Sequence, residues 1–105
     1  MNREIIYQQI RRIVHDCLPG ARILLFGSRA RGDSDRYSDY DLLIITPETF
    51  TPMEKIKWST HINKAIVNII KIPVDLLINS EEEVNQKQEI PGHIIRVAVR
   101  EGVEL

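Results

Sequence analysis

One stretch of the chain constrains its fold more than any other. Gly27 and Ser28 close one apolar run, and Asp39-Tyr40-Asp41 opens the next run, Leu-Leu-Ile-Ile. A short apolar run between turn residues is typical of a buried strand. Glycine at a strand end lets the backbone approach a ligand closely, because it carries no Cβ. The stretch therefore predicts two strands joined by a polar turn, with Ser28 at a helix start suited to bind phosphate.

Helical spacing marks two longer segments of the chain. The first carries an apolar stripe and ends at Pro19-Gly20, residues that stop helices. The second starts at Thr51-Pro52-Met53-Glu54, a capping-box pattern with proline in the first turn, and runs to about Lys71. The side chains expected on the buried faces are Ile6, Ile10, Ile13 and Cys17 in the first helix and Trp58, Ile62, Ala65, Ile66 and Ile69 in the second.

Short apolar runs predict three strands, over residues 21–26, 40–46 and 74–78. The polar stretch 28–38 is expected to be a loop with a short helical turn at its start. Ser80-Glu81-Glu82-Glu83 repeats the capping-box pattern and begins a short, charged helix. Strands that alternate with helices predict an α/β fold, a small sheet covered by one layer of helices or slightly more.

Residues 91–105 fit two structures. A helix would begin at Pro91, with Arg100 in its last turn and Gly102 directly after it. Alternatively, the alternating sequence Ile-Ile-Arg-Val-Ala-Val-Arg would form a hairpin that turns at Glu101-Gly102. Local pattern leaves both structures open, although the β-branched residues favour the hairpin.

Composition excludes several classes of protein. A chain of 105 residues fits one domain, which we expect to span residues 1–105. A net charge of −1 gives no general attraction to nucleic acid or membranes, so we expect no direct nucleic-acid binding. A bound polyanion would need a local cluster such as Arg29, Arg31 and Arg36. The single cysteine, Cys17, excludes an internal disulfide. No apolar run suffices to span a bilayer and no signal peptide is recognisable, so a cytoplasmic protein is expected.

Asp39 and Asp41 lie two residues apart at the start of the predicted second strand. On an extended backbone both side chains point to one face. Two neighbouring carboxylates repel each other and bind protons more tightly unless a cation lies between them. Mg²⁺ suits this position, since it takes oxygen ligands and often binds together with substrate phosphates. The alternative, a capping aspartate beside a solvent-facing one, is disfavoured directly before an apolar strand and after a Gly-Ser turn.

A third carboxylate, Asp75, interrupts the last of the predicted strands. If the second and third strands are neighbours, Asp75 approaches Asp39 and Asp41, and the three would hold two metal ions at an α-phosphate. Asp75 would then help to deprotonate or orient an attacking hydroxyl group. The alternative is an edge-strand aspartate that faces water or binds an arginine. Arg31 follows Ser28 by three residues, so on a helical turn its guanidinium rises beside Ser28 and suits phosphate oxygens.

Together these motifs resemble the DNA polymerase beta nucleotidyltransferase superfamily: Gly27-Ser28, then Asp39-Tyr40-Asp41-Leu42, then Asp75. The sequences GSRARGD and SDYDLLI resemble its minimal nucleotidyltransferase branch, small bacterial and archaeal proteins often encoded beside a HEPN-domain protein. The resemblance implies a small mixed sheet flanked by helices, an α/β (α+β) fold. It also implies a C-terminal helix before Glu101-Gly102, which favours the helix among the two structures above.

The resemblance further implies a role for each site residue. The catalytic acids, which would hold two Mg²⁺ ions, are Asp39, Asp41 and Asp75. The residues that would hold the triphosphate of the nucleotide are Gly27, Ser28 and Arg31. Members of this branch act as antitoxins, which transfer AMP from ATP to a tyrosine of the HEPN toxin or neutralise the toxin by binding it.

Two functions are therefore expected, in order of preference. The first is a Mg²⁺-dependent nucleotidyltransferase that modifies a protein partner such as a HEPN toxin, with ATP as the donor. The second is a non-catalytic antitoxin that neutralises the partner by complex formation. Modification of a small molecule ranks third, because larger family members use an additional domain to bind their acceptor. In this chain the acceptor would come from a partner or from a second copy in a homo-oligomer.

Overall fold

The sheet has four strands in the order β3-β2-β1-β4, in a computed structural model that describes residues 1–105. The strands are β1 (Arg22–Phe26), β2 (Tyr40–Thr46), β3 (Val74–Ser80) and β4 (Val103–Glu104). β1 is antiparallel to both β2 and β4, whereas β2 and β3 are parallel. The three strands expected from the sequence are therefore present, and the sheet is mixed, as predicted.

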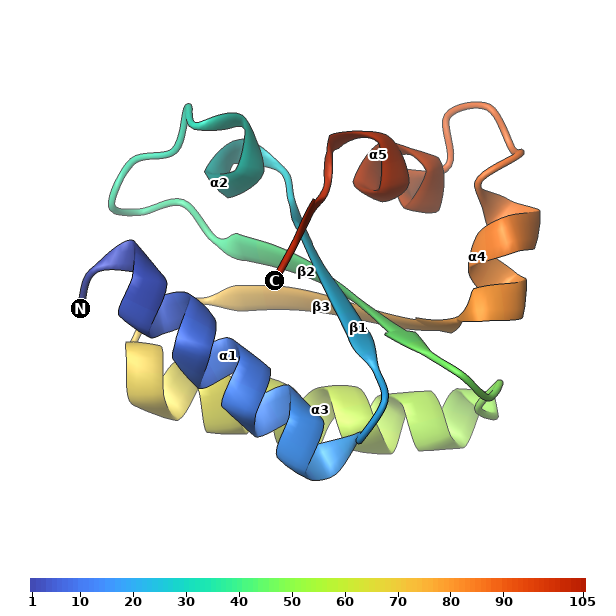
Figure 1. Cartoon of the computed structure of the whole chain (residues 1–105), viewed down its shortest axis with the longest axis horizontal. Coiled ribbons are helices and arrows are strands. Elements are labelled where there is room, and N and C mark those ends of the chain that lie inside the picture. Colours follow the sequence, from blue (N-terminus) through green and yellow to red (C-terminus); the bar gives the residue numbers. More distant parts are fainter.

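Helices cover both faces of the sheet (Figure 1). α1 (Arg3–Cys17) and α3 (Pro52–Ile70) pack together on one face, and α3 is the crossover that joins the parallel strands β2 and β3. α4 (Glu81–Lys87) and α5 (Ile94–Glu101) lie on the other face, and the short α2 (Ser28–Arg31) follows β1 directly. The predicted fold class, a small mixed sheet flanked by helices, is confirmed.

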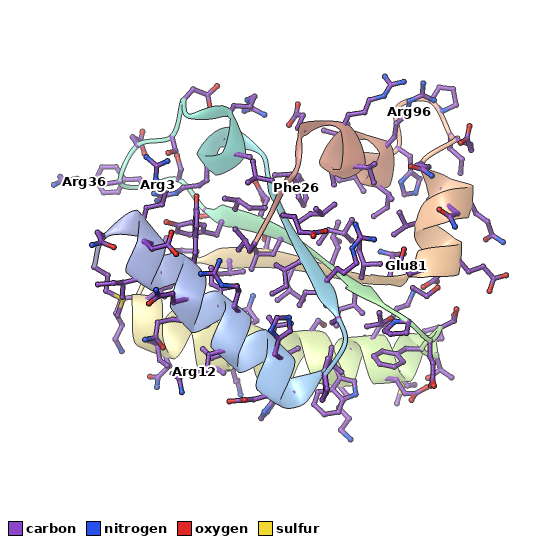
Figure 2. All side chains as sticks on the ribbon, in the orientation of Figure 1. Arg3, Arg12, Phe26, Arg36, Glu81 and Arg96 are labelled. Atoms are coloured by element: carbon purple, nitrogen blue, oxygen red, sulfur yellow. The ribbon has the colours of Figure 1, made fainter.

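The two faces of the sheet bury different side chains. Alternate residues of a strand point to opposite faces, so each apolar run supplies both sides. The larger core packs Ile23, Leu25, Leu42 and Ile44 against Ile10, Ile62 and Ile66 of α1 and α3. The smaller core packs Leu24, Phe26, Leu43 and Ile45 against Val84, Ile95 and Ala98 of α4 and α5 (Figure 2). Burial on both faces explains why β2 lacks the polar alternation of a half-exposed strand.

α1 ends and α3 begins where the sequence indicates. Asn2 caps α1 by accepting a hydrogen bond from the N–H of Ile5 at 2.9 Å, and Thr51 forms the expected capping box of α3 with Glu54. None of the helices combines the length and apolar character that crossing a bilayer requires. Cys17 is half-buried. The buried residues of α3 are Ile62, Ile66 and Ile70, with Trp58, Ala65 and Ile69 half-buried beside them.

The C-terminal residues form a helix followed by a strand. α5 begins at Ile94, after His93, whose Nδ1 accepts a hydrogen bond from the N–H of Ile95 at 3.0 Å. The predicted helix is confirmed, but its start at Pro91 is wrong, because His93 provides the cap further along the chain. A local hairpin at Glu101-Gly102 is also wrong, since Val103–Glu104 pairs with β1 instead.

Gly102 ends α5 for a steric reason. Its φ of −64° is open to any residue, but a Cβ at this position would overlap the carbonyl oxygen of Ala98 and lie 3.3 Å from the Cβ of Leu24. The missing side chain therefore lets the chain turn closely across the end of α5 and reach the edge of β1.

Candidate functional site

Three of the predicted site residues, Gly27, Asp41 and Asp75, lie at one end of the sheet. Phe26, the last residue of β1, pairs with Asp41 of β2, and Asp41 pairs with Asp75 of β3. Residues paired on adjacent strands point to the same face, so the two carboxylates share a face. This is the face of Leu43 and Ile45, on which α4 and α5 pack. The second and third strands are neighbours, so the condition under which Asp75 approaches Asp41 is met.

The three acidic side chains differ in burial. Asp41 is half-buried, whereas Asp39 and Asp75 are exposed. Burial raises the pKa of Asp41 from its ordinary value, the negative charges of Asp75 and Asp39 also raise it, and the charge of Arg31 lowers it. The charges of Asp39 and Asp75 therefore both repel that of Asp41, and a cation beside Asp41 would relieve this repulsion.

The acids do not form a closed ligand cage. No group of three or more His, Cys, Asp or Glu side chains is placed to hold a metal ion. Asp75 lines a shallow hollow beside α3, which Asp39 and Asp41 do not reach. Mg²⁺ commonly binds through one or two carboxylates together with substrate phosphates and water. The oxygen donors present here fit such an open, phosphate-dependent site rather than a preformed metal centre.

Gly27 forms the turn between β1 and α2, directly beside Asp41. Its φ of +73° lies in the left-handed region that glycine adopts at little cost. In addition, a Cβ on Gly27 would overlap the Oδ2 atom of Asp41. Glycine is therefore required at this position both by the backbone and by the carboxylate that packs against it.

Ser28 begins the single helical turn of α2. The N–H groups of Ala30 and Arg31 both donate to the carbonyl oxygen of Gly27, at 3.1 and 3.0 Å. The earlier N–H groups of Ser28 and Arg29 have no acceptor, as the start of a helix requires. The expected helical turn is thus present, and it offers hydrogen-bond donors next to the aspartate end of β2.

Arg31 lies close enough to Asp41 to lower the pKa of that carboxyl. Its side chain is 48% exposed and forms ion pairs with Asp33 at 3.2 Å and Glu101 at 3.3 Å. Sequence reasoning missed the contact with Glu101, because it joins α2 to the end of α5 across 70 positions. An exposed arginine of this kind can exchange a carboxylate for a phosphate with little rearrangement.

The other two arginines of the expected cluster have different positions. Arg29 lies 4.4 Å from the ring centre of Tyr40 and donates to the carbonyl oxygen of Ser38 at 2.7 Å, so it ties the loop to β2. Arg36 lies over the ring of Tyr37, 4.7 Å from its centre, at the periphery of the loop (Figure 2). Arg31 is therefore the member of the predicted cluster that lies beside the acids.

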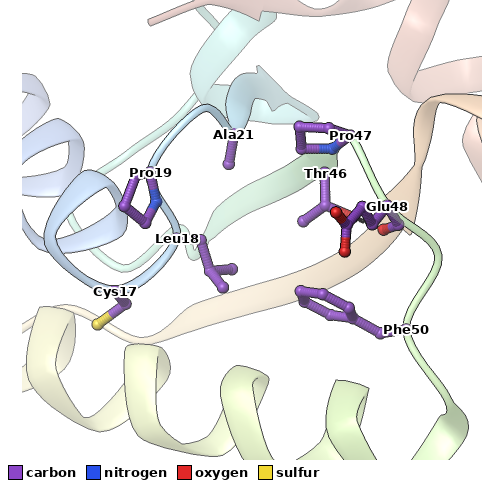
Figure 3. Close-up of a pocket in the computed structure, with 8 residues that line it drawn as sticks. All are labelled: Cys17, Leu18, Pro19, Ala21, Thr46, Pro47, Glu48 and Phe50. Atoms are coloured by element: carbon purple, nitrogen blue, oxygen red, sulfur yellow. Dashed lines mark hydrogen bonds between the residues drawn. The ribbon is translucent and has the colours of Figure 1, made fainter.

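A separate hollow of about 250 Å³ lies near the opposite end of the sheet (Figure 3). Its walls come from the end of α1, including Leu18, and from the segment after β2, including Phe50. Thr46, at the far end of β2 from Asp41, donates to the carbonyl oxygen of Glu48 there at 2.7 Å. Cys17 lines the same hollow, and burial followed by the charge of Asp16 raises the pKa of its thiol. No acid of the candidate site lines this hollow.

A relative and two solved structures resemble the chain. A Methanocaldococcus jannaschii protein, provisionally named a protein adenylyltransferase, is 56% identical over 36 residues, which are 34% of this chain and 36% of that protein. The match thus spans about a third of the relative's length. A chain of a toxin–antitoxin structure with AMP-PNP has a TM-score of 0.68 at 19% identity, over 92% of this chain and 69% of that one.

The second structure is the complex of a tri-AMPylated Shewanella oneidensis HEPN toxin with an MNT antitoxin. One of its chains has a TM-score of 0.59 at 16% identity, over 96% of this chain and 69% of that one. At these identities the similarity establishes a shared fold. The family described as nucleotidyltransferase domain matches residues 7–103, nearly the whole chain. The protein therefore belongs to the nucleotidyltransferase domain family.

Proposed function

We propose that this chain is a Mg²⁺-dependent nucleotidyltransferase that transfers AMP from ATP to a hydroxyl group of a HEPN-domain toxin and so acts as its antitoxin. The observation that carries the proposal is the pairing of Asp41 with Asp75 on parallel strands, beside the Gly27 turn. Two acids, an anion-binding turn and an arginine are the groups that phosphoryl transfer requires. We place this reaction in the cytoplasm. We also propose that residues 1–105 form a single domain.

The nucleotide-binding part consists of Gly27, Ser28 and Arg31. The hydroxyl and free N–H of Ser28 donate to the triphosphate. Gly27 has no side chain, so the triphosphate can come close to the backbone of the turn. Arg31 binds the β- and γ-phosphates in exchange for its contacts with Asp33 and Glu101. Asp39, Asp41 and Asp75 would hold Mg²⁺, which neutralises phosphate charge and polarises the α-phosphorus when bound.

The transfer step forms one phosphorus–oxygen bond and breaks another. The acceptor hydroxyl oxygen bonds to the α-phosphorus of ATP, and the bond from that phosphorus to the oxygen bridging the β-phosphate breaks. Asp75 accepts the hydroxyl proton, for which its exposed position on β3 is suited. The products are an AMP ester of the acceptor and pyrophosphate, which leaves with the electron pair of the broken bond.

The names of the similar proteins support the choice of donor and acceptor. One structure contains AMP-PNP, one contains a tri-AMPylated HEPN toxin with an MNT antitoxin, and the Methanocaldococcus jannaschii relative carries the name of a protein adenylyltransferase. The alternative is an antitoxin that acts by binding alone. The three carboxylates do not form a closed cluster, which favours that alternative. The test below therefore compares catalysis with binding alone.

The test combines the chain with Mg²⁺, ATP and the HEPN-domain protein encoded beside it. ATP labelled at the α-phosphate should transfer its label to the HEPN protein, whereas ATP labelled at the γ-phosphate should not. Transfer should disappear in the Asp41→Asn and Asp75→Asn variants. It should persist in Asp16→Asn, a matched change at an exposed aspartate of α1.

Toxin neutralisation in cells separates the two functions. If catalysis is the mechanism, Asp41→Asn and Asp75→Asn should leave the toxin active. If both variants still neutralise the toxin while label transfer is absent, the chain acts by binding and the enzymatic proposal is wrong.

A further inference from the structure

β3 is the outermost strand of the sheet, so one side of its backbone has no neighbouring strand. Successive residues of a strand direct their N–H and C=O groups alternately to the two sides. The carbonyl oxygen of Pro73 accepts from the N–H of Tyr40 of β2. Val74, Leu76, Ile78 and Ser80 therefore direct their backbone groups outward, away from β2.

Both ends of this outer edge are capped by side chains. The amide of Asn63 on α3 donates to the carbonyl oxygen of Val74 at 2.6 Å, and the N–H of Ser80 donates to Glu83 at 2.9 Å. Between these caps, Leu76 and Ile78 form no side-chain or loop hydrogen bond. The open part of the edge is short, and it offers the N–H and C=O groups of two residues to an added strand.

Shallow hollows follow this edge along the side of α3. The middle hollow, of about 440 Å³, is lined by Asp75, Leu76, Ser59, Asn63 and Lys64, among others. One neighbouring hollow shares Asn63 and Lys64 with it, and the other shares Ser59 and Leu76. The hollows therefore form one continuous groove along the edge of β3, and Asp75 is one of the residues that line it.

The charge of the groove is positive apart from Asp75. The lysines that line it are Lys55, Lys64, Lys71 and Lys87. Two of them share an acidic partner outside the groove, since Lys55 lies 2.6 Å and Lys87 4.0 Å from Glu83. Lys64 and Lys71, at the end near Asp75, belong to none of the ion pairs of the structure. This end of the groove is thus suited to negatively charged side chains.

We propose that the groove binds the acceptor as an extended, acidic peptide segment that adds to β3 as a fifth strand. The inference rests on the proposed function, and it adds the conformation, charge and position of the segment to be modified. The segment exchanges backbone hydrogen bonds with Leu76 and Ile78, as in other cases of strand addition. A residue paired with Asp75 points to the face that Asp75 and Asp41 share, so a hydroxyl side chain there reaches the acids.

A second copy of this chain is the other occupant to consider. Pairing β3 with β3 of another copy about a two-fold axis would be antiparallel, so Lys64 and Lys71 of each copy would lie near the end of the other groove that Lys55 and Lys87 line. Like charges brought together at an interface oppose association. An acidic segment of a different protein has the complementary charge and is therefore the occupant that the groove favours.

The test measures binding without ATP. The probes are a synthetic peptide that alternates glutamate and valine around a central tyrosine, and the same peptide with lysine replacing glutamate. Amide hydrogen exchange of the whole chain should slow at Leu76 and Ile78 when the acidic peptide is added, and not with the lysine peptide. No slowing with the acidic peptide, or slowing that depends only on the concentration of the chain itself, would overturn the proposal.

Two variants and one matched control test the contacts. Lys64→Glu should weaken binding of the acidic peptide by about fivefold, the effect of losing an attraction near 1 kcal/mol. Lys57→Glu, a similar change on the same helix outside the groove, should leave binding within about twofold. Leu76→Pro removes an outward N–H without breaking the ladder to β2, so it should abolish binding. Equal effects of Lys64→Glu and Lys57→Glu would contradict the site.

The peptide-binding test and the label-transfer test of the proposed function can fail independently of each other. If the wild-type chain transfers label to the HEPN protein while the acidic peptide leaves the exchange of Leu76 and Ile78 unchanged, the groove is not the acceptor site and the enzymatic function stands. If the peptide binds at the edge and no label is transferred to any protein, the enzymatic function fails and the docking edge stands.

Discussion

A carboxylate oxygen of Asp41 occupies the space in which a side chain at position 27 would begin, so Gly27 and Asp41 depend on each other sterically. Gly27 also has a φ of +73°, which disfavours other residues independently of Asp41. The turn that presents Ser28 and the strand that presents the acid are thus fitted together. A larger side chain at either residue is expected to disturb both the phosphate-binding turn and the acidic end of β2.

Gly27→Ala should therefore cost more stability than a glycine replacement elsewhere. Gly92→Ala is the matched control, since Gly92 has a φ of +78° and nothing within 4 Å of an added Cβ. The control should cost about 1 kcal/mol of unfolding free energy from backbone strain, and Gly27→Ala about 1–3 kcal/mol more from overlap with Asp41. Chemical denaturation measures both. Combining Gly27→Ala with Asp41→Gly should remove the excess, and an unchanged excess would show that the overlap is not its cause.

Asp41→Asn should stabilise the chain at neutral pH when no divalent cation is present. The pKa of Asp41 is raised by burial and by Asp75 and Asp39, so the folded state favours the protonated carboxyl. The contribution of Asp41 to the free energy of unfolding is therefore fully present below the ordinary carboxyl pKa, and it is lost as pH rises through the raised pKa. The variant's advantage should thus grow with pH in thermal unfolding with a chelator. In the presence of ATP, adding Mg²⁺ should raise the melting temperature of the wild type, but not that of Asp41→Asn. Asp16→Asn should show neither effect.

Glu83 should make the opposite contribution to pH dependence. Burial alone would raise its pKa, but hydrogen bonds from Lys55 and from the N–H of Ser80 outweigh burial and lower it. Stability from a lowered pKa is present above the ordinary glutamate value and is lost as pH falls through the lowered one. Glu83→Gln should cost about 1–2 kcal/mol at neutral pH, and less under acid. Urea unfolding at several pH values measures this, with Glu82→Gln in the same helical turn as the control.

Arg31→Ala should weaken ATP binding without unfolding the chain. Its ion pairs with Asp33 and Glu101 are exposed, so they add little to stability. Loss of a bidentate phosphate contact should raise the dissociation constant for ATP about tenfold. Calorimetry with Mg²⁺ and ATP measures the constant, and thermal unfolding verifies the fold. Arg36→Ala, which changes an arginine at the periphery of the same loop, should bind ATP like the wild type. Equal affinities of Arg31→Ala and the wild type would remove Arg31 from the site.

The sequence predicted helices and strands well where a single local signal, such as a capping box or an apolar run, determined the structure. The capping boxes at Thr51 and Ser80 fixed the start of α3 and α4, and the apolar run after Asp41 fixed β2. The C-terminal segment was harder, because its strand pairs with β1 rather than with a neighbouring stretch. A local pattern contains no information about a partner that lies about 80 positions earlier, as Arg22 and Glu104 illustrate.

For the candidate site, the sequence identified the residues better than their spatial relations. The expectation that Asp39 and Asp41 share a face rested on strand periodicity, but Asp39 precedes β2, and the pairing of Asp41 with Asp75 depended on strand order. The overlap between Asp41 and a side chain at position 27, and the contact of Arg31 with Glu101, arise from tertiary packing. Neither has a signal in the local sequence. The groove beside Asp75 was equally invisible, because α3 and β3 form it together.

The parallel pairing of β2 with β3 has a consequence for insertions and deletions. A shift of β3 by one residue would turn Asp75 toward α3 and place an apolar neighbour opposite Asp41. A single residue gained or lost between Ile70 and Val74 would therefore separate the acids while every one of them stayed in the chain. In homologous sequences, the length of this short connection is accordingly as informative about activity as the aspartates themselves.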